Sequence, residues 1–164
     1  HIKQKFKKNF ISIQPANLYG EGDNFDLKSS HVLPALVKKF TIAKREKKNS
    51  VEVWGSGNVR REFLNVNDLA EAIYFLLKKK IKNDYINIGS GEDVSIKQLA
   101  NLIKKTLDYR GKIIFNNKYP DGVKKRKIDS SIIKKLGWKP KINLHEGLKN
   151  YCKYYQEKIM PLEI

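Results

Sequence analysis

The segment at residues 10–36, FISIQPANLYGEGDNFDLKSSHVLPAL, constrains the fold more than any other part of the chain. Apolar and polar residues alternate at its start, around Ile11, which predicts a β-strand. Pro15 lacks a backbone N–H donor, so we expect that strand to end there. A polar loop follows, and Ser29 or Ser30 could cap the helix after it. The segment therefore reads as a strand, a long polar loop and a helix.

His31 stands where the loop meets the expected helix. In open α/β sheets, ligands bind outside the carboxyl ends of the strands. A helix start also offers free N–H groups to an anion. A lone histidine is nevertheless more often structural than catalytic, and the spacing alone does not decide between the two roles.

Strands and helices alternate along the rest of the chain, which predicts an α/β fold. Strands are expected at residues 51–54, 61–66, 85–88 and 112–115, and helices near 33–47, after Asn67, after Ser95, after Asp129 and after Asn143. The turns Gly55-Ser56-Gly57 and Gly89-Ser90-Gly91 lack the third glycine of a dinucleotide-binding fingerprint. They read as loop turns rather than as a pyrophosphate cradle.

The chain carries a net charge of +17, from 34 Lys and Arg against 17 Asp and Glu. Such a charge could mark a nucleic-acid-binding protein. The basic residues are scattered, however, and the interleaved aromatic and basic residues of RNA-binding domains are missing. We therefore expect no nucleic-acid partner, and favour one local site for a small anion.

Cys152 is the only cysteine, so neither an intrachain disulfide nor a multi-cysteine metal cluster is expected, and we predict no metal site. A reducing compartment, and hence a cytoplasmic location, is the simplest interpretation. No apolar run approaches the roughly 20 residues that a membrane span needs, so we expect no membrane association.

Seven motifs resemble the GDP-L-fucose synthases, a family of extended short-chain dehydrogenase/reductases that act on nucleotide sugars. The motifs are PANLYG (15–20), DNF (23–25), SHVLPAL (30–36), VWGSG (53–57), REFLNVND (61–68), PDG (120–122) and LGW (136–138). They extend over nearly all of this chain but match only the C-terminal half of that family. The resemblance implies the last strands of a Rossmann sheet plus the smaller α/β substrate-binding domain. Residues 1–30 would then be the tail of the cofactor domain and 31–164 mainly the substrate domain, with 66–90 returning to the Rossmann sheet.

The resemblance also implies a catalytic role for His31, as an acid during epimerisation that also lies against the nicotinamide cofactor. Epimerising a carbon beside a ketone needs a base on one face and an acid on the other, which a histidine can provide. The same resemblance implies cofactor contacts from Pro15, Ala16, Asn17 and Leu18. Ala16 stands where a threonine is expected, so only backbone contacts are retained there.

Four residues match the substrate-binding positions of the family: Lys39, Trp54, Arg61 and Asp121. From the residues alone, Trp54 could equally be core filling, Arg61 a surface ion pair and Asp121 an ordinary turn residue. Lys39 replaces an arginine, which keeps the charge but loses the bidentate geometry. Lys125-Arg126 stands where Arg-Lys is usual, which leaves open which of the two reaches phosphate.

The resemblance implies the C-terminal, substrate-binding part of a bifunctional epimerase/reductase that makes GDP-L-fucose from GDP-4-keto-6-deoxy-D-mannose with NADPH. The full-length enzyme is expected to be a homodimer. This chain lacks the Gly-rich fingerprint, and its Tyr-x-x-x-Lys spacings, such as Tyr154 to Lys158 in the last expected helix, do not stand where the resemblance implies the catalytic pair, which belongs to the N-terminal half of the family. We therefore expect most NADPH contacts to lie elsewhere and this fragment alone to be inactive. The alternatives are another nucleotide-sugar epimerase or dehydratase of the same superfamily, or a non-enzymatic basic domain that binds nucleic acid.

Overall fold

Strands and helices alternate along the chain, which confirms the predicted α/β class. The structure, a computed structural model, describes residues 5–6 and 10–163, so 1–4 and 7–9 of the predicted cofactor-domain tail lie outside it. The strands are β1 (Ser12–Pro15), β2 (Asn17–Tyr19), β3 (Ser50–Trp54), β4 (Arg60–Asn65), β5 (Tyr85–Ile88), β6 (Asp93–Ser95), β7 (Lys112–Asn116) and β8 (Lys125–Arg126). The helices are α2 (Val32–Arg45), α3 (Val66–Leu77), α4 (Ile96–Thr106), α5 (Ser131–Lys135) and α6 (Leu144–Tyr154), continued by the π-helix η1 (Tyr155–Ile159) and the 3-10 helix η2 (Met160–Glu163).

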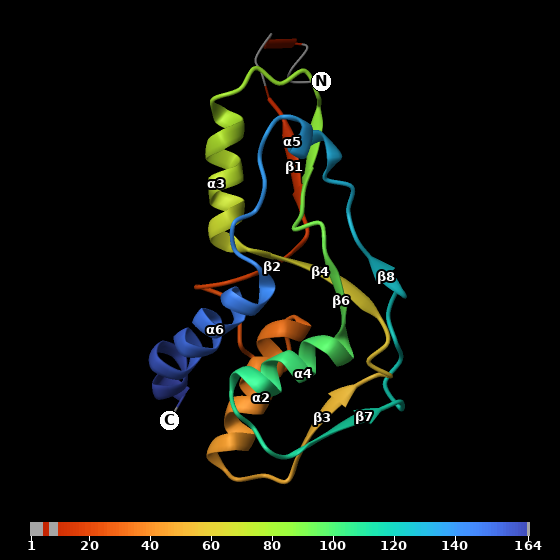
Figure 1. Cartoon of the computed structure of the whole chain (residues 1–164), viewed down its shortest axis with the longest axis vertical. Coiled ribbons are helices and arrows are strands. Elements are labelled where there is room, and N and C mark those ends of the chain that lie inside the picture. The colour runs from red at the N-terminus through yellow and green to blue at the C-terminus, as the bar shows by residue number, and fades with distance from the viewer. Residues whose placement is uncertain (1–4, 7–9, 164) are drawn as a thin grey trace.

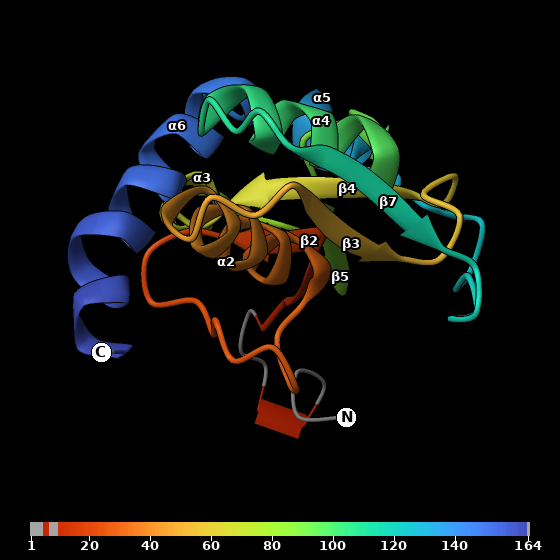
Figure 2. The ribbon, with the colours of Figure 1, turned by 90° about the horizontal axis from the view of Figure 1, so that it is seen from below.

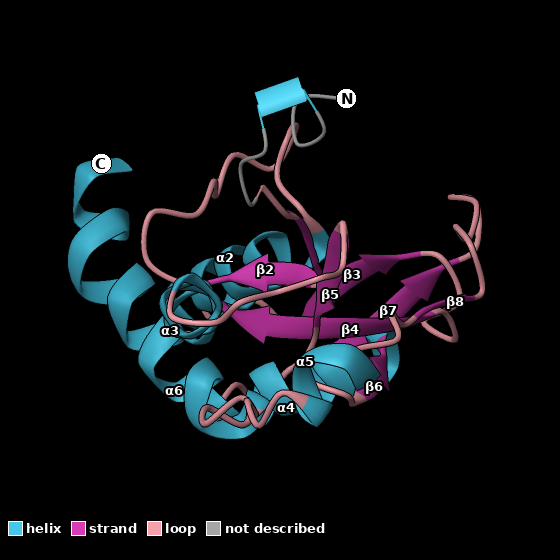
Figure 3. Cartoon of the chain, turned by 90° about the horizontal axis from the view of Figure 1, so that it is seen from above, coloured by secondary structure: helices cyan, strands magenta, loops and turns pink. Residues whose placement is uncertain are grey.

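The molecule is elongated, with a small sheet near each end and a third sheet between them (Figure 1). At one end β1 pairs with β5 in parallel, beside α3 and α5; at the other, β3 pairs with β7 in parallel, beside α2 and α4. Between them β4 pairs with β2 and β8 in parallel and with β6 antiparallel. The strands lie across the middle of the molecule, with α4, α5 and α6 along one side (Figures 2 and 3).

Two hydrophobic cores correspond to the two ends. The larger core joins Leu33, Val37 and Phe40 of α2 to Leu99 and Ile103 of α4. These are the apolar faces that the helical spacing predicts, and they remove the whole inner side of each helix from water. The smaller core gathers residues of β1, α3, β5 and α5, namely Ala72, Leu76, Ile86, Ile88 and Ile133 with their neighbours. The segment 66–90 thus belongs to the smaller core, while the division into two domains stays a prediction.

Two of the predicted helix caps are confirmed. The Ser95 hydroxyl accepts the Gln98 N–H at 3.0 Å, and the Gln98 side chain accepts the Ser95 N–H at 2.8 Å. Asn143 Oδ1 accepts the Glu146 N–H at 3.0 Å at the start of α6. Each bond satisfies one of the N–H groups that a helix start leaves free.

Two other caps are displaced along the chain. Helix α3 is capped by Asn65, whose side chain accepts the Asn67 N–H at 2.9 Å, so the prediction that Asn67 caps this helix is wrong. Asp129 accepts the Ser131 N–H at 2.9 Å, although the residue at the cap position of α5 is Ser130. The type of residue at each helix start was predictable, whereas its position was uncertain by one or two residues.

Asp68 on α3 is a buried carboxylate, with 2% of its surface exposed. Its two oxygens accept the N–H groups of Lys141 and Ile142, both at 3.0 Å. A charge in the interior is tolerated only when such bonds replace water. Asp68 therefore ties the segment before α6 to α3, far along the chain.

Replacing Gly147 by alanine should destabilise the protein, although alanine is the better helix former by about 1 kcal/mol. A Cβ on Gly147 of α6 would lie 1.9 Å from the hydroxyl oxygen of Tyr19, which is buried. We expect this overpacking to lower the free energy of unfolding by about 1–3 kcal/mol. Urea denaturation measures it, with Asn150→Ala, an exposed position on the same helix, as the control. Equal or higher stability of Gly147→Ala would contradict the packing described here.

Candidate functional site

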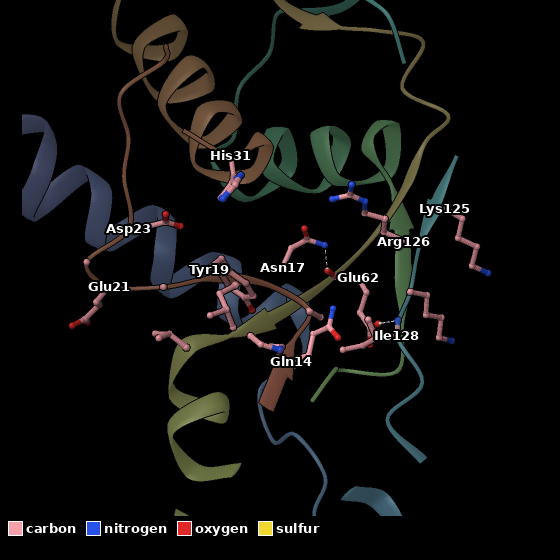
Figure 4. A pocket seen from close by; sticks show the side chains of 17 residues that line it. Gln14, Asn17, Tyr19, Glu21, Asp23, His31, Glu62, Lys125, Arg126 and Ile128 are labelled. Carbon is pink, nitrogen blue, oxygen red and sulfur yellow. Dashed lines mark hydrogen bonds between the residues drawn. The ribbon is translucent and has the colours of Figure 1, made fainter. Parts of the chain in front are cut away.

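A cleft of about 910 Å³ lies between the two cores, at the middle of the molecule (Figure 4). It brings together all five residues predicted for cofactor binding: Pro15, Ala16, Asn17, Leu18 and His31. The other walls come from the loop at 20–23, from Glu62 and from the segment 125–128. None of the substrate-binding residues predicted from the sequence, Lys39, Trp54, Arg61 and Asp121, is among the residues that line this cleft.

The floor of the cleft is a point where the chain changes its strand partner. The Ala16 N–H still donates to the Ile88 carbonyl of β5 at 2.9 Å. From Asn17 onward the chain pairs with β4 instead, in register with Phe63. The Asn17 side-chain amide donates to the Glu62 carbonyl at 2.7 Å and fixes this crossing. Strand β2 was not predicted, because three residues without alternation give no strand signal.

His31 is the N-cap residue of α2, with an exposed side chain at the rim of the cleft. The prediction that Ser29 or Ser30 caps this helix is wrong. The Ser29 hydroxyl instead donates to Asp26 Oδ2 at 2.8 Å inside the loop, and this bond lowers the pKa of the Asp26 carboxyl. Because no side chain caps α2, its first N–H groups remain available beside His31.

The loop before His31 is held against the C-terminal helix. Tyr151 donates its hydroxyl to Asp23 Oδ2 at 2.7 Å, and the Gly22 N–H donates to the Tyr154 hydroxyl at 3.2 Å. The buried Phe25 ring packs on Tyr151 and Tyr155, with centroids 5.3 and 4.6 Å apart. Helix α6 therefore fixes the wall of the cleft that leads to His31.

Trp54 and Tyr119 form an exposed aromatic pair at the carboxyl end of β3 and beyond the end of β7. Their rings stack with centroids 4.4 Å apart and an interplanar angle of 14°, and they are 53% and 40% exposed. Lys39 Nζ lies 4.7 Å from the Trp54 ring centroid, and burial lowers the pKa of this amine. Trp54 is therefore not core filling; it is a flat surface open to a ligand. Tyr119 was not predicted.

Asp121 is held by the turn that follows Trp54. The Ser56 N–H donates to Asp121 Oδ1 at 2.9 Å and the Ser56 hydroxyl donates to Oδ2 at 2.5 Å. These bonds lower the pKa of the Asp121 carboxyl. A Cβ on Gly55, whose φ is +80°, would lie 2.5 Å from Oδ1. The Gly-Ser-Gly turn thus accommodates a carboxylate of the chain itself.

The alternation of strands β4 and β8 separates the basic residues into two sets. Arg60 pairs in register with Lys125, and both reach Asp93, at 2.6 and 3.6 Å. Arg61 pairs in register with Arg126 on the opposite face. Among residues 5–6 and 10–163, no carboxylate forms an ion pair with this second set, and Arg61 donates only to the carbonyls of residues 60 and 123.

Within the described part of the chain, Arg61 and Arg126 thus form a cationic pair without an ion-pair partner. Burial, and secondly the nearby Arg126 charge, lower the pKa of the Arg61 guanidinium. Arg126 lines the cleft and points into it, whereas Lys125 points away (Figure 4). The register shows that Arg126, and not Lys125, is the residue next to Arg61, while which of the two reaches phosphate stays a prediction. Two adjacent guanidinium forks suit an anion with more than one charge.

The segment 119–128, here called the strap, connects the aromatic pair to the cleft. Along it Tyr119 stacks on Trp54, Asp121 bonds Ser56, Val123 accepts from Arg61, and Arg126 enters the cleft. A Cβ on Gly122 would lie 3.2 Å from Arg61 Nη2, so the arginine also lies close to the Pro-Asp-Gly turn. Trp54, Arg61 and Asp121 are therefore arranged along one edge that leads to His31.

Glu62 is a site residue that the sequence did not reveal. It is 1% exposed, and its carboxylate accepts the N–H groups of Gly91 at 2.6 Å and Ile128 at 2.9 Å. The second Gly-Ser-Gly turn, at 89–91, accommodates this carboxylate as the first accommodates Asp121. Both turns therefore bind an internal carboxylate. Within the described part of the chain, no helix is long and apolar enough to cross a membrane.

Known proteins share this arrangement. The model of the NAD dependent epimerase/dehydratase family matches residues 1–89. A probable GDP-L-fucose synthase from Oryza sativa is 45% identical over 150 residues, which are 92% of this chain and 46% of the rice protein. A GDP-6-OMe-4-keto-L-xylo-heptose reductase from C. jejuni superposes with a TM-score of 0.84 at 37% identity, over 94% of this chain and 56% of that one.

A GDP-L-fucose synthetase from Naegleria fowleri, bound to NADP, superposes with a TM-score of 0.88 at 26% identity, over 96% of this chain and 50% of that one. The chain spans about half the length of the curated relatives it matches. The motifs from PANLYG to LGW, the paired parallel strands and these matches agree with one another. The chain belongs to the NAD dependent epimerase/dehydratase family.

Proposed function

We propose that this chain holds the nucleotide sugar in an NADPH-dependent epimerase/reductase that makes GDP-L-fucose. The observation that carries the proposal is the two adjacent arginines, Arg61 and Arg126, which form no ion pair with a carboxylate of the described residues. They are located between an exposed aromatic pair and a cleft with a histidine at its rim. A diphosphate carries two negative charges that such a pair can neutralise. The relatives with names of this type, including the rice protein at 45% identity, support the proposal.

The strap sets the direction of the bound nucleotide sugar. A base would stack on the Trp54–Tyr119 side, the diphosphate would bind Arg61 and Arg126, and the sugar would enter the cleft. Asp121, held by Ser56, keeps lone pairs for a base or ribose donor. Lys39, already beside the Trp54 ring, would add one positive charge.

The cleft floor suits the nicotinamide end of the cofactor. Residues 15–18 are extended, and the small Ala16 side chain leaves the floor open to a flat ring. NADPH, when bound, supplies the hydride that reduces the ketone. Most of its other contacts would come from parts of the relatives that lie outside the alignment, so we propose that this chain alone does not turn over.

His31 would act on the carbons beside the ketone. Epimerisation removes a proton from one face of such a carbon and returns one to the opposite face. The exposed imidazole at the rim of the cleft, beside the uncapped start of α2, is placed to donate that second proton. The base would have to come from another part of the enzyme.

A second candidate is a reductase for a different GDP-linked keto-sugar. It is favoured by the 37% identity to the C. jejuni protein named as a heptose reductase. Both candidates share the nucleotide and the reduction, and they differ in the sugar and in whether epimerisation accompanies the reduction. The homodimer, the cytoplasmic location and the lack of a nucleic-acid partner stay predictions.

Calorimetric titration of this chain with GDP, and with UDP as the control, tests the proposal. We expect GDP to bind at least about tenfold more tightly than UDP, a difference of about 1.4 kcal/mol, because a guanine presents donors that Asp121 can accept. Equal binding of both would show that charge alone attracts the nucleotide. Binding of neither would contradict a preformed nucleotide site in this chain.

A further inference from the structure

The strap has few contacts that fix its place beside β4. Strand β8 has only two residues, both exposed, and its neighbours at 117–127 are exposed or half-buried. The Arg60 N–H donates to the Lys124 carbonyl at 2.8 Å, and Arg61 Nη1 donates to the Val123 carbonyl at 2.7 Å. These contacts hold the start of β8, but neither lies beyond Arg126.

The Glu62 carboxylate holds the other end of β8. Oε2 accepts the Ile128 N–H at 2.9 Å, two residues after Arg126 (Figure 4). Oε1 accepts the Gly91 N–H at 2.6 Å, so the same side chain also binds the turn after β5. A carboxylate bonded to two backbone N–H groups makes charge-assisted bonds, which are the stronger kind.

The turn at 89–91 is shaped around this carboxylate. A Cβ on Gly89 would lie 2.3 Å from Glu62 Oε1, so any larger residue would displace it. Burying a carboxylate is unfavourable compared with burying an apolar side chain, even when it is well bonded. Stability alone is therefore a weak reason for Glu62, whereas its bond to the Ile128 N–H connects the end of the strap directly to β4.

We propose that Glu62 is a positioning residue of the diphosphate site: its carboxylate fixes the end of the strap so that Arg126 stands beside Arg61. This inference rests on the proposed function, because it assigns a role within the same site. Glu62 lines the cleft but is only 1% exposed, and both of its carboxylate oxygens already accept backbone N–H groups, so its role is exerted through Arg126 and not through contact with the ligand.

Glu62→Gln and Asp68→Asn form a matched pair that tests the proposal. Asp68 is equally buried and also accepts two backbone N–H groups, but it does not line the cleft, and its partners are Lys141 and Ile142 and not the strap. In each variant an NH2 group replaces one carboxylate oxygen, so that two hydrogen-bond donors face each other. Both variants should therefore have a lower melting temperature than the unchanged protein. Only Glu62→Gln should raise the Kd for GDP, by about tenfold, which corresponds to about 1.4 kcal/mol.

A double-mutant cycle adds a readout that a merely structural role would not change. In an Arg126→Ala background, Glu62→Gln should leave the Kd for GDP within about twofold, because the arginine that it positions is gone. Equal effects of Glu62→Gln and Asp68→Asn on the Kd, or an undiminished effect without Arg126, would overturn the inference. If the unchanged chain does not bind GDP, the proposed function fails first.

A second pair keeps the test decisive if Glu62→Gln does not fold. Ile128→Pro removes the N–H that Glu62 Oε2 accepts, whereas Ile128→Ala keeps it and loses similar apolar contact. The proline variant should bind GDP about tenfold more weakly than the alanine variant. Equal Kd values for the two would overturn the inference.

Discussion

Replacing His31 by alanine should lower the turnover of the complete enzyme by about 10²–10⁴-fold, the usual contribution of a general acid. His31 stands at the rim of the cleft with an exposed imidazole, and no hydrogen bond commits that ring to another part of the described chain. The loss should fall on kcat. The Kd for GDP should stay within about twofold, because the nucleotide contacts lie along the strap.

The assay joins this chain to the part of a plant relative that the alignment leaves out. NADPH oxidation with GDP-4-keto-6-deoxy-D-mannose measures the whole reaction. Inversion at the carbons beside the ketone, followed by NMR in deuterated solvent without NADPH, measures epimerisation alone. His145→Ala, an exposed histidine in the first turn of α6, is the matched control, and the unjoined chain is the blank. An unchanged rate of inversion in His31→Ala would refute the assignment of His31 as the acid.

The local patterns that predicted this site correctly are those that depend on short segments. The end of β1 at Pro15, the place of His31 at the start of a helix and the apolar face of α2 are all set within a few residues. The helix caps shifted because several polar residues compete for each start. Ser29 is the clearest case, since its hydroxyl donates a hydrogen bond to Asp26 in the same loop and does not cap the helix.

The parts that could not be predicted depend on residues far apart in the chain. Glu62 looks like an ordinary strand residue until Ile128, 66 positions later, is seen to donate to it. Likewise only the register of β8 against β4 tells that Arg126, and not Lys125, shares a face with Arg61. The two Gly-Ser-Gly turns were predicted as turns. The carboxylates that they bind, those of Asp121 and Glu62, were not predicted, since no local pattern links each turn to its carboxylate.

Replacing Arg126 by alanine should raise the Kd for GDP by about 10–150-fold, because hydrogen bonds to charged groups contribute about 1.5–3 kcal/mol. Arg61→Ala should have an effect of similar size. The double variant should lose more than the product of the two, since the remaining guanidinium in each single variant can turn towards the anion, whereas the double variant has neither guanidinium. Isothermal titration at fixed salt measures all three.

Lys125→Ala is the control that makes this prediction specific to geometry. Like Arg126→Ala, it removes one positive charge from the two-residue strand β8, at the position next to Arg126. Its side chain lies on the opposite face with Asp93 and Arg60, so its loss should change the Kd for GDP by no more than about twofold. If net charge alone attracted the nucleotide, the two variants would weaken binding equally. A larger effect of Arg126→Ala at both low and high salt therefore separates a built diphosphate site from the general attraction of a chain with a charge of +17.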